Sequence, residues 1–207
     1  QPAQQSVDGE LVPFTKMRAT IARRMQQSVN EAPHFHTTAA ISMDQAQELR
    51  DGLRKKPEFK GLSVNHLIVK AAAYALVKEP RVNRAARGDK VLVPKHINIG
   101  IVTAVEDGLL IPVVKDADRL SLQRVVAEAR LVVERAKSGK PLAGDLVGAT
   151  FSISNVGMYD IENFTAIISP GQGAILSVSA IREEPVVRNG RIVIGQMMRV
   201  TLAVDHR

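Results

Sequence analysis

The feature of this sequence that most constrains its fold is the order in which helical and strand-like hydrophobic patterns follow one another. The first helical pattern places Met17, Ile21, Met25 and Val29 at steps of four, which forms one apolar stripe. Helical patterns cover residues 16–30, 44–55, 63–79 and 121–137. Strand patterns cover residues 34–43, 91–93, 97–105, 109–114, 150–156, 164–168, 174–181, 186–188 and 191–205. Because the two kinds of pattern do not strictly alternate, the sequence predicts an α+β domain with helices packed on a mostly antiparallel or mixed sheet.

Capping and turn residues indicate where these segments begin and end. Pro33 ends the first helix, and Asp44 and Ser63 are predicted to be the N-caps of the next two helices. Asn189-Gly190 is the strongest hairpin signal in the chain, and Asp107-Gly108 predicts a turn between two earlier strands. We therefore expect a strand-rich C-terminal part that contains at least one β-hairpin.

Composition limits what kind of core and which compartment the chain can have. The 207 residues suffice for one large domain or two small ones, and 45% of them are hydrophobic. Only 3% are aromatic, so Val, Ile, Leu, Ala and Met must build the core. There is no cysteine, which excludes disulfides and thiolate metal sites and fits a reducing compartment. The longest apolar stretch, residues 67–77, is interrupted by Lys70 and is too short to span a membrane.

The N-terminal residues differ in character from the rest of the chain. Residues 1–9 are polar and contain neither an initiating Met nor a signal peptide. We interpret residues 1–10 as the remnant of a linker in a chain cut from a longer protein, and residues 11–207 as one folded domain.

The net charge of +7 permits nucleic acid, an anionic membrane or a phosphate-bearing ligand as a partner. The basic residues are scattered, and their densest groups, Arg23-Arg24 and Arg54-Lys55-Lys56, form no long basic arm. With two Tyr and no Trp, the chain offers few platforms on which bases could stack. The charge pattern therefore favours a solvated face with one polyanionic ligand site, and neither a nucleic acid nor a membrane is predicted as a partner.

Two places combine polar side chains with the end of a predicted strand. His206, the second-to-last residue, follows an apolar strand and could act as a base at the rim of a cleft, or simply face solvent. Ser152 and Ser154 lie on one face of a strand that ends near Gly157. Their hydroxyls could stabilise an oxyanion, or be ordinary strand residues.

Other candidate sites are weaker. Residues 107–114 form a turn and an apolar strand with Pro112, which suits an edge strand or a channel wall. Arg23 and Arg24 could bind a phosphate or a buried carboxylate. His34 and His36 share one face of a predicted strand but have no carboxylate at ligand spacing, so no metal site is predicted. The chain has no P-loop, no GxGxxG and no Gly-x-Ser-x-Gly motif.

Four segments of the chain match one family in both sequence and order. They are residues 18–28 followed by Pro33-His34-Phe35, residues 98–101 followed by 107–114, residues 150–157 followed by 164–170, and the terminal Asp205-His206-Arg207. Together they resemble the catalytic domains of the dihydrolipoamide acyltransferases of 2-oxo acid dehydrogenase complexes, over about residues 11–207. The resemblance implies the chloramphenicol-acetyltransferase-like fold, a two-layer sandwich of a mixed sheet with helices on one side.

The resemblance also implies a reaction and its residues. An acyl group moves between a dihydrolipoyl thiol and the thiol of coenzyme A, with His206 as general base and Ser154 as donor to the oxyanion. The segment from Met158 to Phe164 is similar to that of acetyltransferases, which favours acetyl as the acyl group. The residues that the resemblance assigns to ligand binding are Arg24 (with Arg23 as the neighbouring option), Asn83, Leu109 and Pro112.

The family's assembly implies several partners. Its members are trimers with each active site at a subunit interface, and the trimers build a larger core. Coenzyme A is a substrate, the lipoyl group belongs to a separate domain, and no metal is implied. Upstream domains bind the decarboxylase and dihydrolipoamide dehydrogenase subunits. The compartment implied is the bacterial cytoplasm or the mitochondrial matrix.

Three departures from the family pattern stand in this sequence. The chain ends at Arg207, so the second half of the histidine motif and the final helix are absent. Ser169-Pro170-Gly171-Gln172 replaces the usual Asn-Pro-Pro-Gln, and Ser177-Val178-Ser179 replaces a more glycine-rich stretch. Two alternatives stay open: a non-catalytic structural subunit of the same complex, and an acetyltransferase that acts on a small hydroxyl acceptor.

Overall fold

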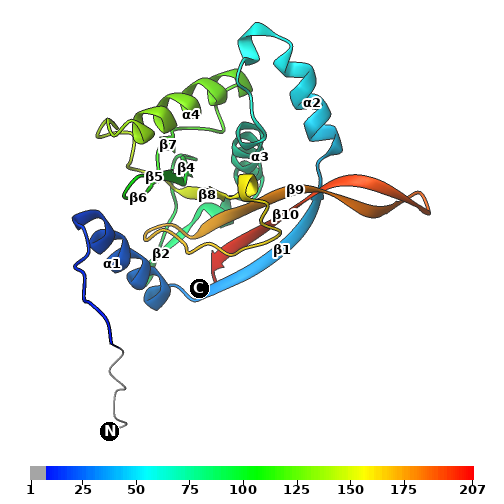
Figure 1. Ribbon diagram of the computed structural model, residues 1–207. Helices are drawn as coiled ribbons and strands as arrows, with labels where there is room; N and C mark the ends of the chain where they lie inside the picture. Colours follow the sequence, from blue (N-terminus) through cyan, green and yellow to red (C-terminus); the bar gives the residue numbers. More distant parts are fainter. Residues whose placement is uncertain (1–7) are drawn as a thin grey trace.

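The computed structural model describes residues 8–207, so part of the predicted linker 1–10 lies outside the described residues. Figure 1 shows how the elements are arranged. The helices are α1 (Lys16–Glu31), α2 (Asp44–Arg54), α3 (Val64–Lys78) and α4 (Leu122–Lys137), with short 3-10 helices η1 (Pro57–Phe59), η2 (Pro80–Asn83) and η3 (Gly157–Tyr159). The strands are β1 (His34–Ser42), β2 (Ala85–Arg87), β3 (Lys90–Leu92), β4 (Ile99–Ile101), β5 (Thr103–Val105), β6 (Gly108–Leu110), β7 (Val113–Val114), β8 (Phe151–Asn155), β9 (Ala174–Arg188) and β10 (Arg191–Asp205). No helix within residues 8–207 has the length and hydropathy needed to cross a membrane.

Six strands form one mixed sheet in the order β1-β10-β9-β8-β4-β7. The strand β8 runs parallel to both of its neighbours, β4 and β9, whereas the other neighbouring strands are antiparallel. The pairs β2–β3 and β5–β6 form two small antiparallel sheets of their own. The predicted α+β class with a mixed sheet is confirmed.

The hydrophobic core lies between one face of this sheet and the helices α3 and α4 (Figure 1). Every second strand residue points to that face, because side chains alternate along a strand. Ile153 of β8 and Val178 of β9 share this core with Val69 of α3 and Val125 of α4, and none of the four is more than 1% exposed. The core is almost entirely aliphatic, as the low aromatic content predicts.

The opposite face of the sheet is more polar and is covered by residues 157–173, a segment that is irregular apart from η3. Thr201 of β10 donates a hydrogen bond to Asn163 of this segment, and Ile168 packs against Ile175 of β9. The strand predicted for residues 164–168 is therefore wrong. Its alternating apolar residues pack onto the sheet face instead of pairing with another strand.

A long hairpin of β9 and β10 extends beyond the rest of the sheet, at the right of Figure 1. Its turn is the predicted Asn189-Gly190, and both residues have positive φ, as a type I′ turn requires. The prediction of separate strands at 174–181 and 186–188 is wrong, because β9 continues through Pro185. Pairing of β8 with β9 ends at Val178, so Pro185 lies where β9 has a free edge and its missing N–H removes no sheet hydrogen bond.

The strands predicted at 97–105 and 109–114 each divide in two. The segments β4 and β7 belong to the main sheet, whereas β5 and β6 leave it as a separate two-stranded ribbon. In the turn between β5 and β6, Val105 pairs with Gly108. The loop residues are therefore Glu106 and Asp107, one position earlier than predicted. This ribbon brings β6 to the polar face of the sheet, where the cavity described below lies.

Of the two predicted N-caps, Ser63 is confirmed and Asp44 is wrong. Met43 is the N-cap of α2, and Asp44 is its first helical residue. The Asp44 carboxylate forms an ion pair with Arg188 and accepts a hydrogen bond from the backbone N–H of Gln196 at 3.1 Å. The bond from Arg188, which has the largest effect, and the bond from Gln196 hold the Asp44 pKa well below its usual value. Asp44 therefore ties α2 to the β9–β10 hairpin.

His66 gives the fold a predicted pH dependence. It is buried in the first turn of α3, and its Nδ1 accepts the backbone N–H of the N-cap Ser63 at 3.0 Å. Burial, and secondarily the charge of Arg130, lowers the His66 pKa below its ordinary value of 6.5. A histidine whose pKa is lower in the folded state than in the unfolded state stabilises the fold at pH values above its unfolded-state pKa. This contribution is lost as the pH falls below the unfolded-state pKa.

We therefore expect the free energy of unfolding to fall as the pH drops from about 7 to about 5, near and below the ordinary histidine pKa. Denaturant titrations at several pH values would measure this. His66→Gln should be less stable at neutral pH and should flatten the pH dependence in that window. An equally steep dependence in the variant would contradict the role given to His66.

Candidate active site

A cavity of about 540 Å³ lies on the polar face of the sheet. Its walls come from α1, β6, the loops at residues 146–149 and 164–172, and the adjacent strands β8 and β9. The lining is mainly apolar, with Arg24, Ser154, Ser169 and Gln172 as its polar members. A mainly apolar cavity of this size with a few polar groups is typical of a small-molecule site.

Strand β8 places Ser154 in this cavity. Phe151 and Ile153 of the same strand are anchored in the core on the other face, so the intervening serines must point toward the cavity side. Ser152 is fully buried and its hydroxyl donates to Oε1 of Gln172 at 2.8 Å, whereas Ser154 is half-buried and lines the cavity. The Ser154 hydroxyl is thus held by a rigid strand and is accessible to a ligand.

Helix α1 forms the outer wall of the cavity. Thr15 caps the helix by accepting the N–H of Arg18, and Ser28 donates to the carbonyl of Ile168 at 2.5 Å. The apolar stripe predicted for this helix is only partly covered, because Ile21 and Met25 of that stripe face the cavity.

The structure distinguishes between the two arginines that the sequence left open. Arg24 lines the cavity, whereas Arg23 does not. Leu109, another predicted ligand-binding residue, also lines it, from β6. A cation at the wall of an otherwise apolar cavity suits a ligand that carries negative charge.

His206 lies away from this cavity, beyond the end of β10. Its backbone N–H donates to the carbonyl of Pro33 at 3.0 Å, and its ring lies edge-on to that of Phe35, with centroids 5.3 Å apart. Within residues 8–207, the ring nitrogens of His206 have no hydrogen-bond partner in the same chain. A single chain therefore exposes the His206 ring at the edge of the sheet and does not bring it to Ser154.

The neighbours of His206 form an ion pair with each other. The Asp205 carboxylate accepts from the backbone N–H of Arg207 at 3.1 Å and from Nη2 of its guanidinium at 2.7 Å. The hydrogen bond from the Arg207 guanidinium lowers the Asp205 pKa below its ordinary value. This pairing turns the Arg207 side chain back onto the end of β10.

His34 is a scaffold residue of this region. Its Nδ1 bonds to the carbonyl of Ala32 at 2.7 Å and its Nε2 accepts the N–H of Ile168 at 3.0 Å. Both ring nitrogens are therefore occupied, which leaves neither free for a metal ion. His34 joins the start of β1 to the loop that covers the cavity.

Two predicted ligand-binding residues do not line the cavity. Pro112 is fully buried, and Asn83 is 5% exposed with its amide donating to the carbonyl of His96 at 3.2 Å. Asn83 is the last residue of η2, and the next residue, Arg84, lies against the chain just before β9: a Cβ on Gly173 would come within 1.8 Å of the Arg84 carbonyl oxygen. A role for either residue in ligand binding stays a prediction.

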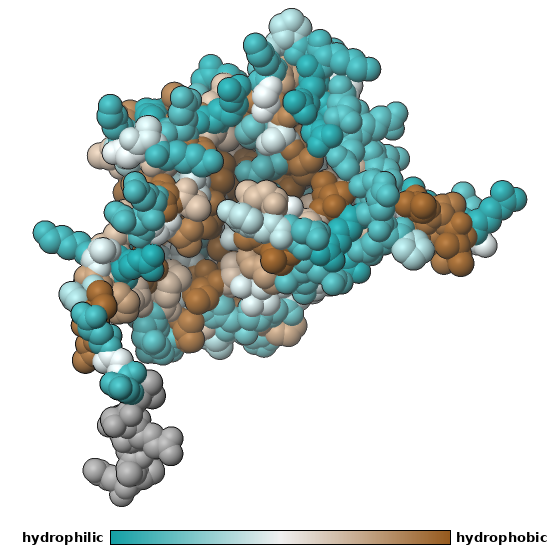
Figure 2. Space-filling model, in the orientation of Figure 1, coloured by the Kyte–Doolittle hydropathy of each residue, from teal (hydrophilic) through white to brown (hydrophobic). Residues whose placement is uncertain are grey.

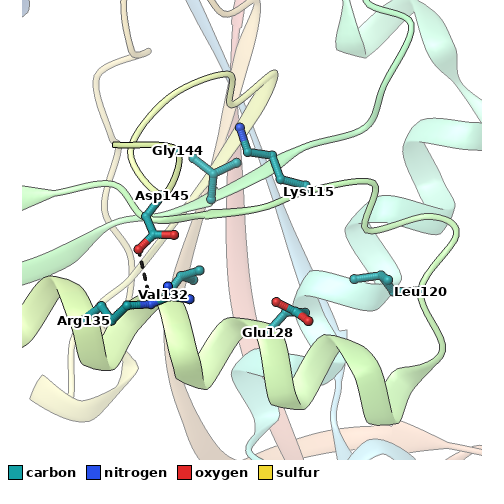
Figure 3. Close-up of a pocket in the computed structure, with 8 residues that line it drawn as sticks. Lys115, Leu120, Glu128, Val132, Arg135, Gly144 and Asp145 are labelled. Atoms are coloured by element: carbon teal, nitrogen blue, oxygen red, sulfur yellow. Dashed lines mark ion pairs between the residues drawn. The ribbon is translucent and has the colours of Figure 1, made fainter. Parts of the chain in front are cut away.

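A second, smaller cavity of about 170 Å³ lies beside α4 (Figure 3). Arg135 of α4 pairs there with Asp145 at 3.3 Å, and Asp145 also accepts the backbone N–H of Leu142. Lys115 and Glu128 are further charged residues of its lining. The ion pair ties the loop at Asp145 to α4, and none of the predicted site residues lines this cavity.

Sequence reasoning missed the residues that support the site. The Ser152–Gln172 and Thr201–Asn163 bonds join residues that are 20 and 38 positions apart, and no spacing rule indicates such pairs. Phe35 was noted only as part of a motif, although its ring contacts His206. The two residues lie close together because β1 pairs with β10, and this pairing could be inferred only once the strand order of the sheet was known.

The fold and the cavity define an α+β domain of the chloramphenicol-acetyltransferase type. A solved chloramphenicol acetyltransferase superposes with a TM-score of 0.51 at 13% identity, covering 89% of this chain and 85% of that one, which shows a shared fold. The chain belongs to the 2-oxoacid dehydrogenases acyltransferase (catalytic domain) family, whose model matches residues 7–207. The resemblance found in the sequence motifs is therefore confirmed.

Named relatives are components of one complex. The dihydrolipoyllysine-residue acetyltransferase component of the pyruvate dehydrogenase complex of Rickettsia conorii is 34% identical, covering 95% of this chain and 48% of that protein. The mitochondrial component 3 of Arabidopsis thaliana is 37% identical, covering 100% of this chain and 39% of that protein. The chain thus spans about half or less of the length of these relatives.

Solved relatives are similar throughout the domain. The cubic core of a pyruvate dehydrogenase multienzyme complex has a TM-score of 0.92 at 30% identity, covering 100% of this chain and 89% of that one. The Azotobacter vinelandii dihydrolipoamide acetyltransferase has a TM-score of 0.90 at 30% identity, covering 99% of this chain and 88% of that one. That structure was determined in a study of a serine, a histidine and an asparagine in the catalytic mechanism.

Proposed function

We propose that this protein transfers an acetyl group between a dihydrolipoyl thiol and the thiol of coenzyme A within a 2-oxo acid dehydrogenase complex. The observation that carries the proposal is the mainly apolar cavity of about 540 Å³ into which Ser154 points, in a chain of the acyltransferase family. The named relatives are acetyltransferase components, which supports acetyl as the acyl group.

In the proposed reaction, His206 removes the proton from the thiol of coenzyme A. The resulting thiolate attacks the carbonyl carbon of the acetyl-dihydrolipoyl thioester, and the carbonyl oxygen becomes an oxyanion that accepts a hydrogen bond from Ser154. The intermediate collapses, expels the dihydrolipoyl thiolate and leaves the acetyl group on coenzyme A. The protonated His206 returns its proton to the departing thiolate. A thiol needs only modest help from a base whose pKa lies near neutrality.

The proposal requires two subunits for each site, because His206 lies away from the cavity of its own chain. We place His206 of one subunit opposite Ser154 of the next. The exposure of β1 supports this: eight of its nine residues are exposed, including the apolar Phe35 and Ile41, although it is an edge strand beside His206. An exposed apolar edge strand is normally covered by another chain or element.

The β9–β10 hairpin provides a second apolar surface for assembly. Figure 2 shows hydrophobic residues gathered on this projecting arm, and Val187, Ile192 and Ile194 there are each more than 70% exposed. Exposed apolar groups of this kind mark contact surfaces. We propose a homotrimer that assembles further into a large core, as in the cubic core of the related complex.

The proposed substrates and partners follow from the cavity and the family. Arg24 and the net charge of +7 suit the phosphates of coenzyme A, and the apolar lining suits the uncharged arms of both thiol substrates. The lipoyl group is carried by a separate domain, and the decarboxylase and dihydrolipoamide dehydrogenase are the other enzyme partners. The proposed compartment is the bacterial cytoplasm or the mitochondrial matrix, and one relative is mitochondrial.

Two measurements on the purified protein test this function. Incubation with acetyl-coenzyme A and dihydrolipoamide should yield S-acetyldihydrolipoamide and free coenzyme A, and light scattering should give a trimer or a multiple of three. Acetylation of a small alcohol with none of dihydrolipoamide would replace the proposed acceptor. A large assembly without any transfer would instead indicate a structural subunit, and an active monomer would contradict the shared site.

A further inference from the structure

Four hydroxyl residues form a row across the polar face of the sheet. Ser154 of β8 is the register partner of Ser177 of β9, Ser177 is the partner of Thr201 of β10, and Thr201 is the partner of Thr38 of β1. Register partners on neighbouring strands point to the same face of a sheet. The row therefore runs from the edge strand to the cavity, and Ser154 is its cavity end.

Part of this row is already hydrogen-bonded. Thr201 donates its hydroxyl proton to Oδ1 of Asn163 at 2.7 Å, so in the 2.8 Å contact between Thr38 and Thr201 the donor must be Thr38. Thr201 thus has a partner for its only proton and already accepts one hydrogen bond. Both hydroxyl protons of the outer half, those of Thr38 and Thr201, are therefore already used without Ser177, and the Thr201 oxygen keeps one further lone pair.

Ser177 is the exception in the row. Its side chain is 0% exposed, and its Oγ has no hydrogen-bond partner. A hydroxyl buried without a partner is unfavourable, and such groups in native proteins often serve a function. The Ser177 proton has two neighbours in register, Ser154 and Thr201, and Thr201 already has both a donor and an acceptor partner within the described residues.

We propose that Ser177 is a positioning residue that donates its hydroxyl proton to Oγ of Ser154 when Ser154 donates its own proton to the oxyanion. This inference rests on the proposed acyl transfer. A hydroxyl that accepts one hydrogen bond becomes a better donor of the next, because hydrogen bonds in a chain polarise one another. The donation also fixes the rotamer of Ser154, whose proton then points away from Ser177 and into the cavity. No covalent bond or net proton transfer is involved.

Ser177→Ala tests the proposal, because it removes one buried, unpaired oxygen and leaves the volume almost unchanged. We expect kcat for acetyl transfer to fall about 3- to 10-fold, the size expected for one neutral hydrogen bond, with the KM of both thiol substrates within about twofold. Ser179→Ala is a matched control. Ser179 lies two positions along β9, is 2% exposed and also has no partner for its Oγ, but it is not the register partner of Ser154.

The two variants should be at least as thermally stable as the parent, because neither loses a hydrogen bond and each loses a buried, unpaired oxygen. Only Ser177→Ala should lose kcat. Combining it with Ser154→Ala completes a double-mutant cycle: if Ser177 acts through Ser154, the second substitution should cost less than about twofold when Ser154 is already alanine.

Three outcomes would overturn the inference, and they differ in what else they affect. Equal kcat in Ser177→Ala and Ser179→Ala would remove the role of Ser177 and leave the acyltransferase function intact. A 3- to 10-fold loss that persists in the Ser154→Ala background would show that Ser177 acts by another route. Absence of acetyl transfer in the parent protein itself would overturn the proposed function, and the role of Ser177 with it.

Discussion

Replacing His206 with alanine is expected to lower kcat for acetyl transfer by about 10³-fold, since a positioned general base contributes 10²- to 10⁴-fold. Without the imidazole, only the small fraction of coenzyme A that is already thiolate at neutral pH can attack the thioester. His206 is exposed and its ring makes no hydrogen bond within residues 8–207 of its own chain, so the fold should tolerate the change. Steady-state kinetics across a pH range would measure the effect.

The pH profile makes this prediction more specific than a loss of rate. In His206→Ala kcat/KM should follow the ionisation of the thiol itself, so its dependence on pH should differ from that of the parent protein. His96→Ala is a suitable control, because His96 is an exposed histidine that pairs with Asp116 and does not line the cavity. A variant that kept the full rate would remove His206 from the role of base.

Local signals in the sequence were sufficient to place most of the helices. Thr15, Ser63 and Ser121 each precede a helix whose apolar spacing is regular, and α1, α3 and α4 begin at the next residue. The Asn189-Gly190 turn was similarly predictable, because only a few residue types accept positive φ at two successive positions. In each case the physical cause lies within four residues of the effect.

Features that depend on distant residues were the ones that sequence reasoning missed or misassigned. Phe164, Ala166 and Ile168 alternate as a strand would, yet their alternation serves packing against the sheet face. Asp44 has the right residue type for an N-cap, but Arg188 and Gln196, about 150 positions away, hold its carboxylate. Periodicity and capping rules contain no information on such partners, and tertiary contacts override them.

The candidate site divides in the same way. The resemblance to a family indicated Ser154 and Arg24, and the structure places both at one cavity. The surroundings of His206 could not be predicted, because the groups that it must meet belong to another copy of the chain in the proposed assembly. The unpaired hydroxyl of Ser177 was visible in the sequence only as a departure from the glycine-rich pattern, and its register with Ser154 required the sheet.

Ser154→Ala is expected to lower kcat by about 10²- to 10³-fold, which is the usual cost of removing one oxyanion donor. The thioester oxygen carries full negative charge only in the tetrahedral intermediate, so the hydroxyl stabilises the transition state more than the bound substrate. The KM of both thiols should therefore change by less than about threefold. The substitution leaves the β8 backbone and its core residues Phe151 and Ile153 in place, so loss of folding is not expected.

The split between kcat and KM distinguishes this role from simple binding. Ser138→Ala, at an exposed serine that follows α4, is the matched control and should change neither constant by more than about twofold, as is usual for surface positions. A rise in KM with kcat unchanged would show that Ser154 binds substrate and transition state equally.

Because Ser154 and His206 come from different subunits in the proposed site, mixing the two inactive variants gives a final test. Mixed trimers should regain activity at sites that pair an intact Ser154 with an intact His206, whereas two residues of one chain acting together could not be restored in this way.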